Sequence, residues 1–272
     1  MFIRFWGVRG SIASPGPDTV RYGGNTSCVE IRCDQHVVIC DAGTGLRPLG
    51  QLLTSEEKAI DVDILCSHTH FDHVCGFPFF GPCYLPGNRI RVWAGHDAAR
   101  GDIASVFRLI TTPPLFPDVM NTFAATLEFK NFKCGDDLSL RPGLTVRTGA
   151  LNHPGGATGY RIEWQGKVVA YLTDTEHRVA SLDANVLALA QQADVMIYDA
   201  NYTNEDYAQY AGFGHSTWQE AVKLAAQASA RRLVLFHHDA ARTDALLDDI
   251  ADAAKKARSG TIVAREGLVL NI

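Results

Sequence analysis

The sequence predicts an α/β protein in which helices cover the outer faces of β-sheets. Strands that alternate with helices along a chain are typical of this class. Short runs of strand-like composition recur throughout, and segments with helical periodicity lie between several of them. No Ser/Gly-rich linker or low-complexity tract divides the chain, so we expect residues 1–272 to form a single domain. The strand-like runs are 2–8, 28–33, 36–40, 60–66, 90–94, 144–151, 158–164, 167–173, 194–199, 231–236, 261–264 and 267–271, and the helical segments are about 45–54, 97–110, 180–192, 216–229 and 242–257.

Composition narrows the classes of protein. A chain that is 46% hydrophobic and 20% charged has the balance of an ordinary globular protein that can bury a core. Its formal net charge of -5 provides no general attraction for polyanions, so nucleic-acid binding would need a local basic patch.

The sequence predicts neither a signal peptide nor a membrane span. The opening residues 1–6 read as a first strand and lack the basic, apolar and cleavage segments of a signal peptide. No apolar run approaches the ~20 residues of a membrane span, so we expect no membrane partner. The seven cysteines are odd in number and contain no CxxC pair, which favours buried thiols over disulfides. The cytoplasm is the expected compartment.

Residues 67–73, Ser-His-Thr-His-Phe-Asp-His, follow the apolar run 62–66 and predict a metal site. Imidazole suits zinc, copper, iron and nickel, and a carboxylate extends the choice toward manganese. In an extended or turning segment His68 and His70 point the same way, while Asp72 and His73 can turn toward a second ion. Cys75 is near enough to be a further ligand, but we favour packing because the other groups suffice.

Isolated polar residues at the ends of later strand-like runs supply the remaining ligands. Because loops at the ends of several strands can converge on one cleft, these residues complete a site for two divalent ions. His68, His70 and His153 could hold one ion, Asp72, His73 and His237 the other, and Asp174 would bridge both. The donor set fits Zn²⁺ best and would also accommodate Mn²⁺ or Fe²⁺.

The segment 111–119, Thr-Thr-Pro-Pro-Leu-Phe-Pro-Asp-Val, cannot be a regular helix or central strand, because three prolines remove backbone donors. It could form an apolar rim over the metals together with Phe77, Phe79 and Phe80. An ordinary surface connection is the equal alternative.

The motif His68-Thr-His-Phe-Asp-His73 resembles the signature of the metallo-β-lactamase superfamily, and its order with His153, Asp174 and His237 matches as well. The resemblance covers nearly the whole chain. It implies an αββα sandwich of two similar halves, with two mixed β-sheets flanked by helices and a dinuclear site at one edge. The choice of His237 over the adjacent His238 rests on this resemblance.

Further segments resemble the ribonuclease Z and phosphodiesterase branch of that superfamily. They are residues 7–11, 23–27 and 41–45, together with Tyr198-Asp-Ala-Asn-Tyr202 and Gly214-His-Ser-Thr217. The resemblance implies that His215 is a catalytic histidine beside the metals and that Asp199 orients it. Ser216 or Thr217 could also cap a helix with Glu220, and both roles are compatible. Asp41 could either hydrogen-bond a ligand histidine or only close its glycine-rich turn.

One departure from ribonuclease Z bears on the substrate. That family carries a long arm, rich in glycine and basic residues, that grips transfer RNA. Here only Pro154–Tyr160 links His153 to the next strand, which with the acidic net charge disfavours transfer RNA processing. The whole pattern resembles most closely the small bacterial phosphodiesterase-like hydrolases of the superfamily.

We therefore expect a dinuclear metal-dependent hydrolase that cleaves a small or cyclic phosphodiester through a metal-bridging hydroxide. His215, Asp199 and Asp72 are the expected catalytic residues. The alternatives are a ribonuclease Z-like endonuclease acting on RNA 3′ ends, a thioester or lactone hydrolase, and a metal-dependent sensor module without catalysis. A homo-oligomer is compatible with the sequence, which contains no signal for the oligomeric state.

Overall fold

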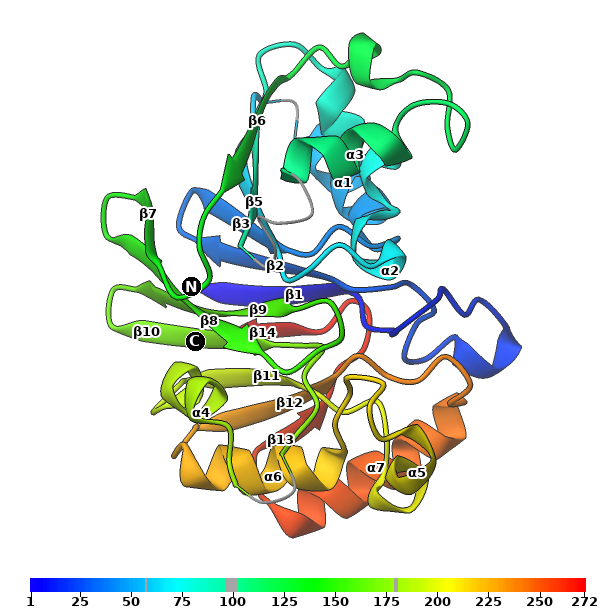
Figure 1. Cartoon of the computed structure of the whole chain (residues 1–272), viewed down its shortest axis with the longest axis vertical. Coiled ribbons are helices and arrows are strands. Elements are labelled where there is room, and N and C mark those ends of the chain that lie inside the picture. Colours follow the sequence, from blue (N-terminus) through cyan, green and yellow to red (C-terminus); the bar gives the residue numbers. More distant parts are fainter. Residues whose placement is uncertain (57, 96–101, 179–180) are drawn as a thin grey trace.

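The computed structural model describes residues 1–56, 58–95, 102–178 and 181–272. Two seven-stranded mixed sheets face each other, and helices cover their outer faces, which makes an αββα sandwich (Figure 1). The predicted fold class is confirmed.

The first sheet has the strand order β14-β1-β2-β3-β4-β5-β6. Neighbours from β14 to β3 are antiparallel, and neighbours from β3 to β6 are parallel. Its strands are β1 (Phe2–Gly7), β2 (Cys28–Cys33), β3 (His36–Cys40), β4 (Asp61–Cys66), β5 (Arg89–Ala94), β6 (Thr126–Asn131) and β14 (Val269–Asn271).

The second sheet has the order β13-β12-β11-β10-β9-β8-β7 and repeats this arrangement. Neighbours from β7 to β10 are antiparallel, and neighbours from β10 to β13 are parallel. Each sheet thus combines antiparallel and parallel neighbours in the same way, as expected for a chain made of two similar halves. The strands are β7 (Asp137–Arg141), β8 (Leu144–Leu151), β9 (Ala157–Trp164), β10 (Lys167–Leu172), β11 (Val195–Asp199), β12 (Arg232–Phe236) and β13 (Thr261–Val263).

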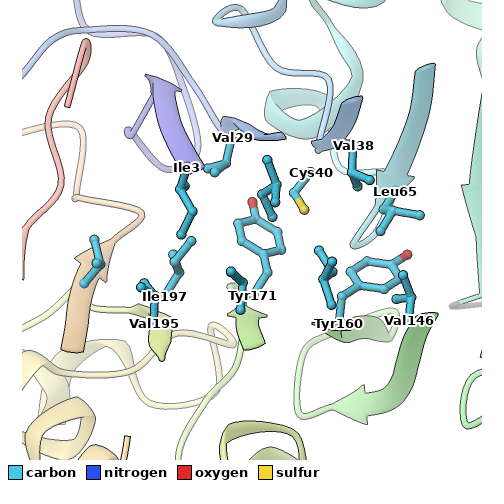
Figure 2. Packing of buried hydrophobic residues seen from close by; sticks show 14 of the residues in the cluster. Ile3, Val29, Val38, Cys40, Leu65, Val146, Tyr160, Tyr171, Val195 and Ile197 are labelled. Atoms are coloured by element: carbon cyan, nitrogen blue, oxygen red, sulfur yellow. The ribbon is translucent and has the colours of Figure 1, made fainter. Parts of the chain in front are cut away.

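The core layer between the sheets is built from alternate residues of facing strands. In β1, Ile3 and Phe5 are fully buried, while their chain neighbours are partly exposed. Figure 2 shows Ile3 and Val29 of the first sheet opposite Val195 and Ile197 of the second, and Leu65 opposite Val146. Burying one such side chain stabilises the fold by ~1.5–3 kcal/mol, so this layer holds the sheets in register against each other.

Helices form the outer layers because each has one apolar side. Helices α1 (Leu46–Ser55) and α3 (Ile103–Ile110) lie on the first sheet, and α4 (Ala184–Ala190), α6 (Trp218–Gln227) and α7 (Asp244–Ala257) lie on the second (Figure 1). The predicted apolar stripe of α6 packs inward through Ala221, Leu224 and Ala225. Thr217 caps α6 by accepting the backbone N–H of Glu220, as expected.

Several short elements were not predicted. The strand β6 is only half-buried and has no strong apolar pattern, and β7 is a short strand whose alternation rests on two leucines, Leu138 and Leu140. Helix α5 (Asn204–Tyr210) has no buried residue, and α2 (Phe71–Val74) is a single turn within the motif. The 3₁₀ turns are Pro17–Thr19, Phe77–Phe79, Gly81–Tyr84 and Met120–Thr122. Of the predicted helices, residues 97–101 and 180 lie outside the described residues.

Within the described part of the chain, no helix combines the length and apolar character needed to cross a membrane. The seven cysteines are free thiols, and all except Cys75 and Cys134 are buried, as predicted.

Candidate metal centre

The candidate site lies where polar residues follow buried strands by one or two positions. Asp41 follows β3, Asp174 follows β10, and His237 follows β12. All three have left-handed backbone conformations, with φ of 63°, 57° and 60°. Non-glycine residues seldom adopt this conformation, and they concentrate at functional sites. The sharp turn after each strand lets the side chain point toward the same edge of the sandwich.

The structure brings all the predicted ligands together around Asp174. One oxygen of Asp174 lies 3.3 Å from Nε2 of both His73 and His237. Its other oxygen lies 3.7 Å from Nε2 of His68 and 3.8 Å from Nε2 of His153. Asp174 therefore lies between the two predicted trios. In each trio the potential ligand atoms lie within 4.8 Å of one another, and the trios are His68, His70 and His153, and Asp72, His73 and His237.

The cluster fits a metal site for a physical reason. Nε2 of His68 is buried without a hydrogen-bond partner. Nε2 of His73 and of His237 face each other at 3.2 Å, and Nε2 of His153 lies 3.1 Å from Nδ1 of His70. A cation among these nitrogens would satisfy several lone pairs at once, whereas a purely structural packing leaves a buried polar atom unpaired.

The protonation of His68, His153 and Asp72 suits metal binding. Burial lowers the pKa of His68 and of His153, so both rings are neutral near pH 7 and keep a lone pair for an ion. The pKa of Asp72 is held well below its usual range: burial opposes ionisation, but the charges and hydrogen bonds of His73 and His237 outweigh burial. Asp72 therefore offers a carboxylate.

The other ring nitrogens are held by hydrogen bonds. Nδ1 of His68 lies 3.1 Å from Oγ of Ser67, and Nδ1 of His153 lies 2.9 Å from the carbonyl oxygen of Gly214. Such partners fix the tautomer and the orientation of a ligating imidazole. In both residues Nε2 is consequently left to face the cluster.

Asp41 holds His73 in the same way. Its Oδ2 accepts hydrogen bonds from Nδ1 of His73 at 2.8 Å, from Oγ of Ser67 at 2.8 Å and from the hydroxyl of Tyr171 at 2.7 Å. Its Oδ1 accepts the Ser67 backbone N–H at 2.7 Å. Of the two alternatives for Asp41, the hydrogen bond to a candidate ligand is the one the structure contains.

The two adjacent histidines after β12 have different surroundings in the structure. His237 points into the cluster, whereas Nε2 of His238 bonds the carbonyl oxygen of Ala264 at 2.8 Å. Burial lowers the pKa of His238 to about 3. Cys75 lies outside the groups that could hold an ion among the described residues, and its Sγ lies 3.9 Å from Oγ1 of Thr26.

The pair Asp199 and His215 lies beside this cluster. Nδ1 of His215 lies 2.8 Å from Oδ2 of Asp199 and 3.9 Å from Oδ1 of Asp174. The His215 ring stacks on that of His237, with centroids 5.0 Å apart. Burial opposes protonation of His215, but the charge and hydrogen bond of Asp199, with Asp174 and Asp72, outweigh it and raise the pKa of His215 to about 9.

Two supporting residues could not be assigned a role from the sequence. The backbone N–H of Ser11 donates to Oδ2 of Asp72 at 2.8 Å, and Nδ2 of Asn201 donates to the carbonyl oxygen of His237 at 3.0 Å. Gly10 is needed beside them, because a Cβ there would lie 2.5 Å from the His237 ring. The only signal for these residues was their place within the motifs at 7–11 and 198–202.

The predicted apolar rim is wrong in part. Phe77 and Phe80 are fully buried, because they pack in the core between the first sheet and its helices. Phe79 is 52% exposed, and its ring meets that of Phe116 in the segment 111–119 edge to face at 5.3 Å. The segment thus contacts one of the three phenylalanines.

Most of the chain matches one known protein family. The model of the "Beta-lactamase superfamily domain" matches residues 36–238. The chain belongs to the beta-lactamase superfamily. This confirms the superfamily that the sequence motif predicts.

Individual relatives agree with the predicted branch. Ribonuclease Z from Bacillus cereus (strain B4264) is 28% identical over 138 residues, which cover 51% of this chain and 41% of the ribonuclease. The match thus spans less than half of that enzyme's length.

Two solved structures share the fold over nearly the whole chain. The metallo-beta-lactamase fold protein YhfI from Bacillus subtilis has a TM-score of 0.71 at 20% identity, with 99% of each chain covered. The short form of human tRNase Z has a TM-score of 0.71 at 21% identity, covering 100% of this chain and 99% of that one. These likenesses establish the fold alone.

Proposed function

We propose that this protein is a dinuclear metal-dependent phosphodiesterase that acts on a small or cyclic phosphodiester. The observation that carries the proposal is the hydrogen bond between Asp199 and His215, placed directly beside the candidate metal ligands. Many hydrolytic reactions can use a pair of metal ions, so the cluster alone does not select a substrate.

The donor set divides between two ions. His68, His70 and His153 would hold one, Asp72, His73 and His237 the other, and Asp174 would reach both. Bound divalent ions supply neutralisation of phosphate charge and activation of water at neutral pH. Zn²⁺ fits imidazole and carboxylate donors best, and Mn²⁺ or Fe²⁺ are the alternatives.

His215 supplies a proton for the leaving group, which the metal ions do not. Cleavage of a phosphodiester releases an alkoxide, which needs a proton. Asp199 engages Nδ1 of His215, so the proton on Nε2 is the one that can be given to the leaving oxygen. General acid catalysis of this kind is worth a factor of ~10²–10⁴. Asp72 acts with this pair as a ligand whose carboxylate is fixed by the backbone N–H of Ser11.

The main alternative is a ribonuclease Z-like endonuclease, which the similarity to ribonuclease Z favours. Two features weigh against it. Only residues 152–156 join β8 to β9, and the two strands stay paired up to Leu151 and Ala157, so this connection carries no long arm. The net charge of -5 also disfavours a polyanionic substrate.

A substrate panel on protein of known metal content tests the proposal. The panel contains bis(p-nitrophenyl) phosphate, cyclic nucleotides, a thioester, a lactone and a precursor transfer RNA. We expect kcat/KM to be highest for the small diesters. Clean 3′ cleavage of the RNA would favour the endonuclease, and faster thioester or lactone turnover would favour those reactions. Two bound ions without any hydrolysis would favour a sensor module.

A further inference from the structure

An exposed aromatic side chain lies in the loop that leads into His215. Phe213 is 62% exposed, and it is flanked by Gly212 and Gly214, which have φ of 91° and 88°. The loop passes directly over a candidate ligand, because a Cβ on Gly214 would lie 2.3 Å from Nδ1 of His153. A single exposed phenylalanine is common on protein surfaces. A role for Phe213 therefore depends on where its ring lies relative to the site and on whether its loop is held in place.

Glu176 fixes this loop. Its carboxylate accepts the backbone N–H of Gly212 at 2.8 Å, the N–H of Gly214 at 3.0 Å and the hydroxyl of Tyr207 at 2.6 Å. The backbone of Glu176 is itself bonded to Asn152, by its N–H to the Asn152 carbonyl oxygen at 2.8 Å and by its carbonyl oxygen to the Asn152 side chain at 3.0 Å. One half-buried carboxylate therefore holds the backbone on both sides of Phe213.

A series of aromatic contacts connects Phe213 with the proposed acid. The Phe213 ring lies edge to face with Tyr210 at 6.0 Å, and Tyr210 stacks on Tyr202 at 4.8 Å with an interplanar angle of 8°. Tyr202 lies 6.0 Å from the ring of His215. Tyr210 is 39% exposed, so the outer part of the series offers a ring surface to solvent beside the site.

The chain segments around the site carry very little positive charge. Three segments carry the ligands of the motif together with His153 and His215, and none of them contains a lysine or arginine. The segments are 67–88, 149–160 and 200–222. A substrate with many phosphates would need such cations along its path. A diester with one negative charge needs only the metal centre.

Two arginines from adjoining segments are already engaged. Arg178 forms an ion pair with Asp183 at 3.0 Å, and Arg242 forms one with Asp206. Neither is left as an unpaired cation for a second phosphate.

From these observations we propose that Tyr210 and Phe213 form a subsite for an aromatic or apolar ester group of a singly charged diester. This inference rests on the proposed function and specifies the substrate class of the same site. Stacking on such a platform accepts any planar group, including a nucleobase or an aryl ring, because every such group has a π-face.

Two diesters with the same leaving group test the subsite: methyl p-nitrophenyl phosphate and phenyl p-nitrophenyl phosphate. Only the group that stays on phosphorus differs, so a change in the ratio of their kcat/KM values between wild type and variant reports its binding. We expect the wild-type protein to prefer the phenyl ester. Phe213→Ala should lower that preference by about tenfold, as loss of one stacking partner does, and Phe213→Tyr should keep it.

The control is Val269→Ala, an exposed apolar residue on β14, the edge strand of the first sheet, which should leave the ratio unchanged. Metal content and melting temperature of each variant verify that the loop change leaves the site intact. An unchanged ratio in Phe213→Ala, with both diesters still hydrolysed, overturns the subsite and leaves the phosphodiesterase proposal standing. A wild-type protein that hydrolyses neither diester while hydrolysing another substrate class overturns both.

Discussion

Oδ2 of Asp199 accepts hydrogen bonds from Nδ1 of His215 at 2.8 Å and from the backbone N–H of Asp174 at 3.1 Å. One carboxylate oxygen therefore fixes both the proposed general acid and the residue between the two metal positions. A change at Asp199 should consequently affect proton transfer and the metal centre together.

The activity should fall at alkaline pH. Burial lowers the pKa of His215, but Asp199, Asp174 and Asp72 outweigh burial and raise it to about 9. A proton donor works below its pKa and fails above it, and bound divalent ions add positive charge that moves this pKa downward. We expect kcat to decrease as pH rises through a value at or below 9. A pH profile from 6 to 10 that stays flat on the alkaline side would exclude His215 as the acid.

Asp199→Asn should keep a hydrogen bond to His215 while removing the charge that holds its proton. We expect kcat to fall by about 10²-fold, within the range for loss of general acid catalysis, and the alkaline limb to move to lower pH. Asp252→Asn on the exposed side of α7 is the matched control. An unshifted limb in Asp199→Asn would show that Asp199 does not set the protonation of His215.

Asp41→Asn tests the support of the metal centre. Asp41 accepts the Nδ1–H of His73, and loss of such a partner typically weakens metal affinity by ~10–100-fold. Competition with a chromophoric chelator measures this directly, and the exposed Asp34→Asn serves as control. Equal affinity in the two variants would mean that His73 needs no orientation from Asp41.

Removal of metal should destabilise the fold as well as stop turnover. A ligand that binds only the native state stabilises it by ~4 kcal/mol at a thousand times its Kd. We expect a chelator to lower Tm and added Zn²⁺ to restore both Tm and activity. Calorimetry with and without chelator makes the measurement. A Tm that is independent of metal would argue against a site built from these residues.

The sequence predicted the fold where burial leaves a strong pattern and missed it elsewhere. The central strands β4, β11 and β12 are nearly continuous apolar runs, which are read easily. The half-buried β6 and the polar α5 have no such periodicity, because tertiary packing rather than pattern places them.

The candidate ligands were predictable because polar residues directly after buried strands are conspicuous. The choice between His237 and His238 could not be derived from the pattern, since it depends on the left-handed backbone at His237. Ser11 and Tyr171 escaped prediction for another reason. Ser11 acts through its backbone N–H, and Tyr171 lies inside an apolar strand where a tyrosine normally only packs.

The most direct test of the account is His215→Ala, measured for metal content and for turnover of a cyclic nucleotide, whose leaving alkoxide needs a proton. We predict that the variant binds as much metal as the wild-type protein while kcat falls by ~10²–10⁴-fold. Loss of metal with turnover would instead make His215 a ligand. Undiminished turnover at full metal content would contradict the role of His215 and with it the assignment of this site to phosphodiesters.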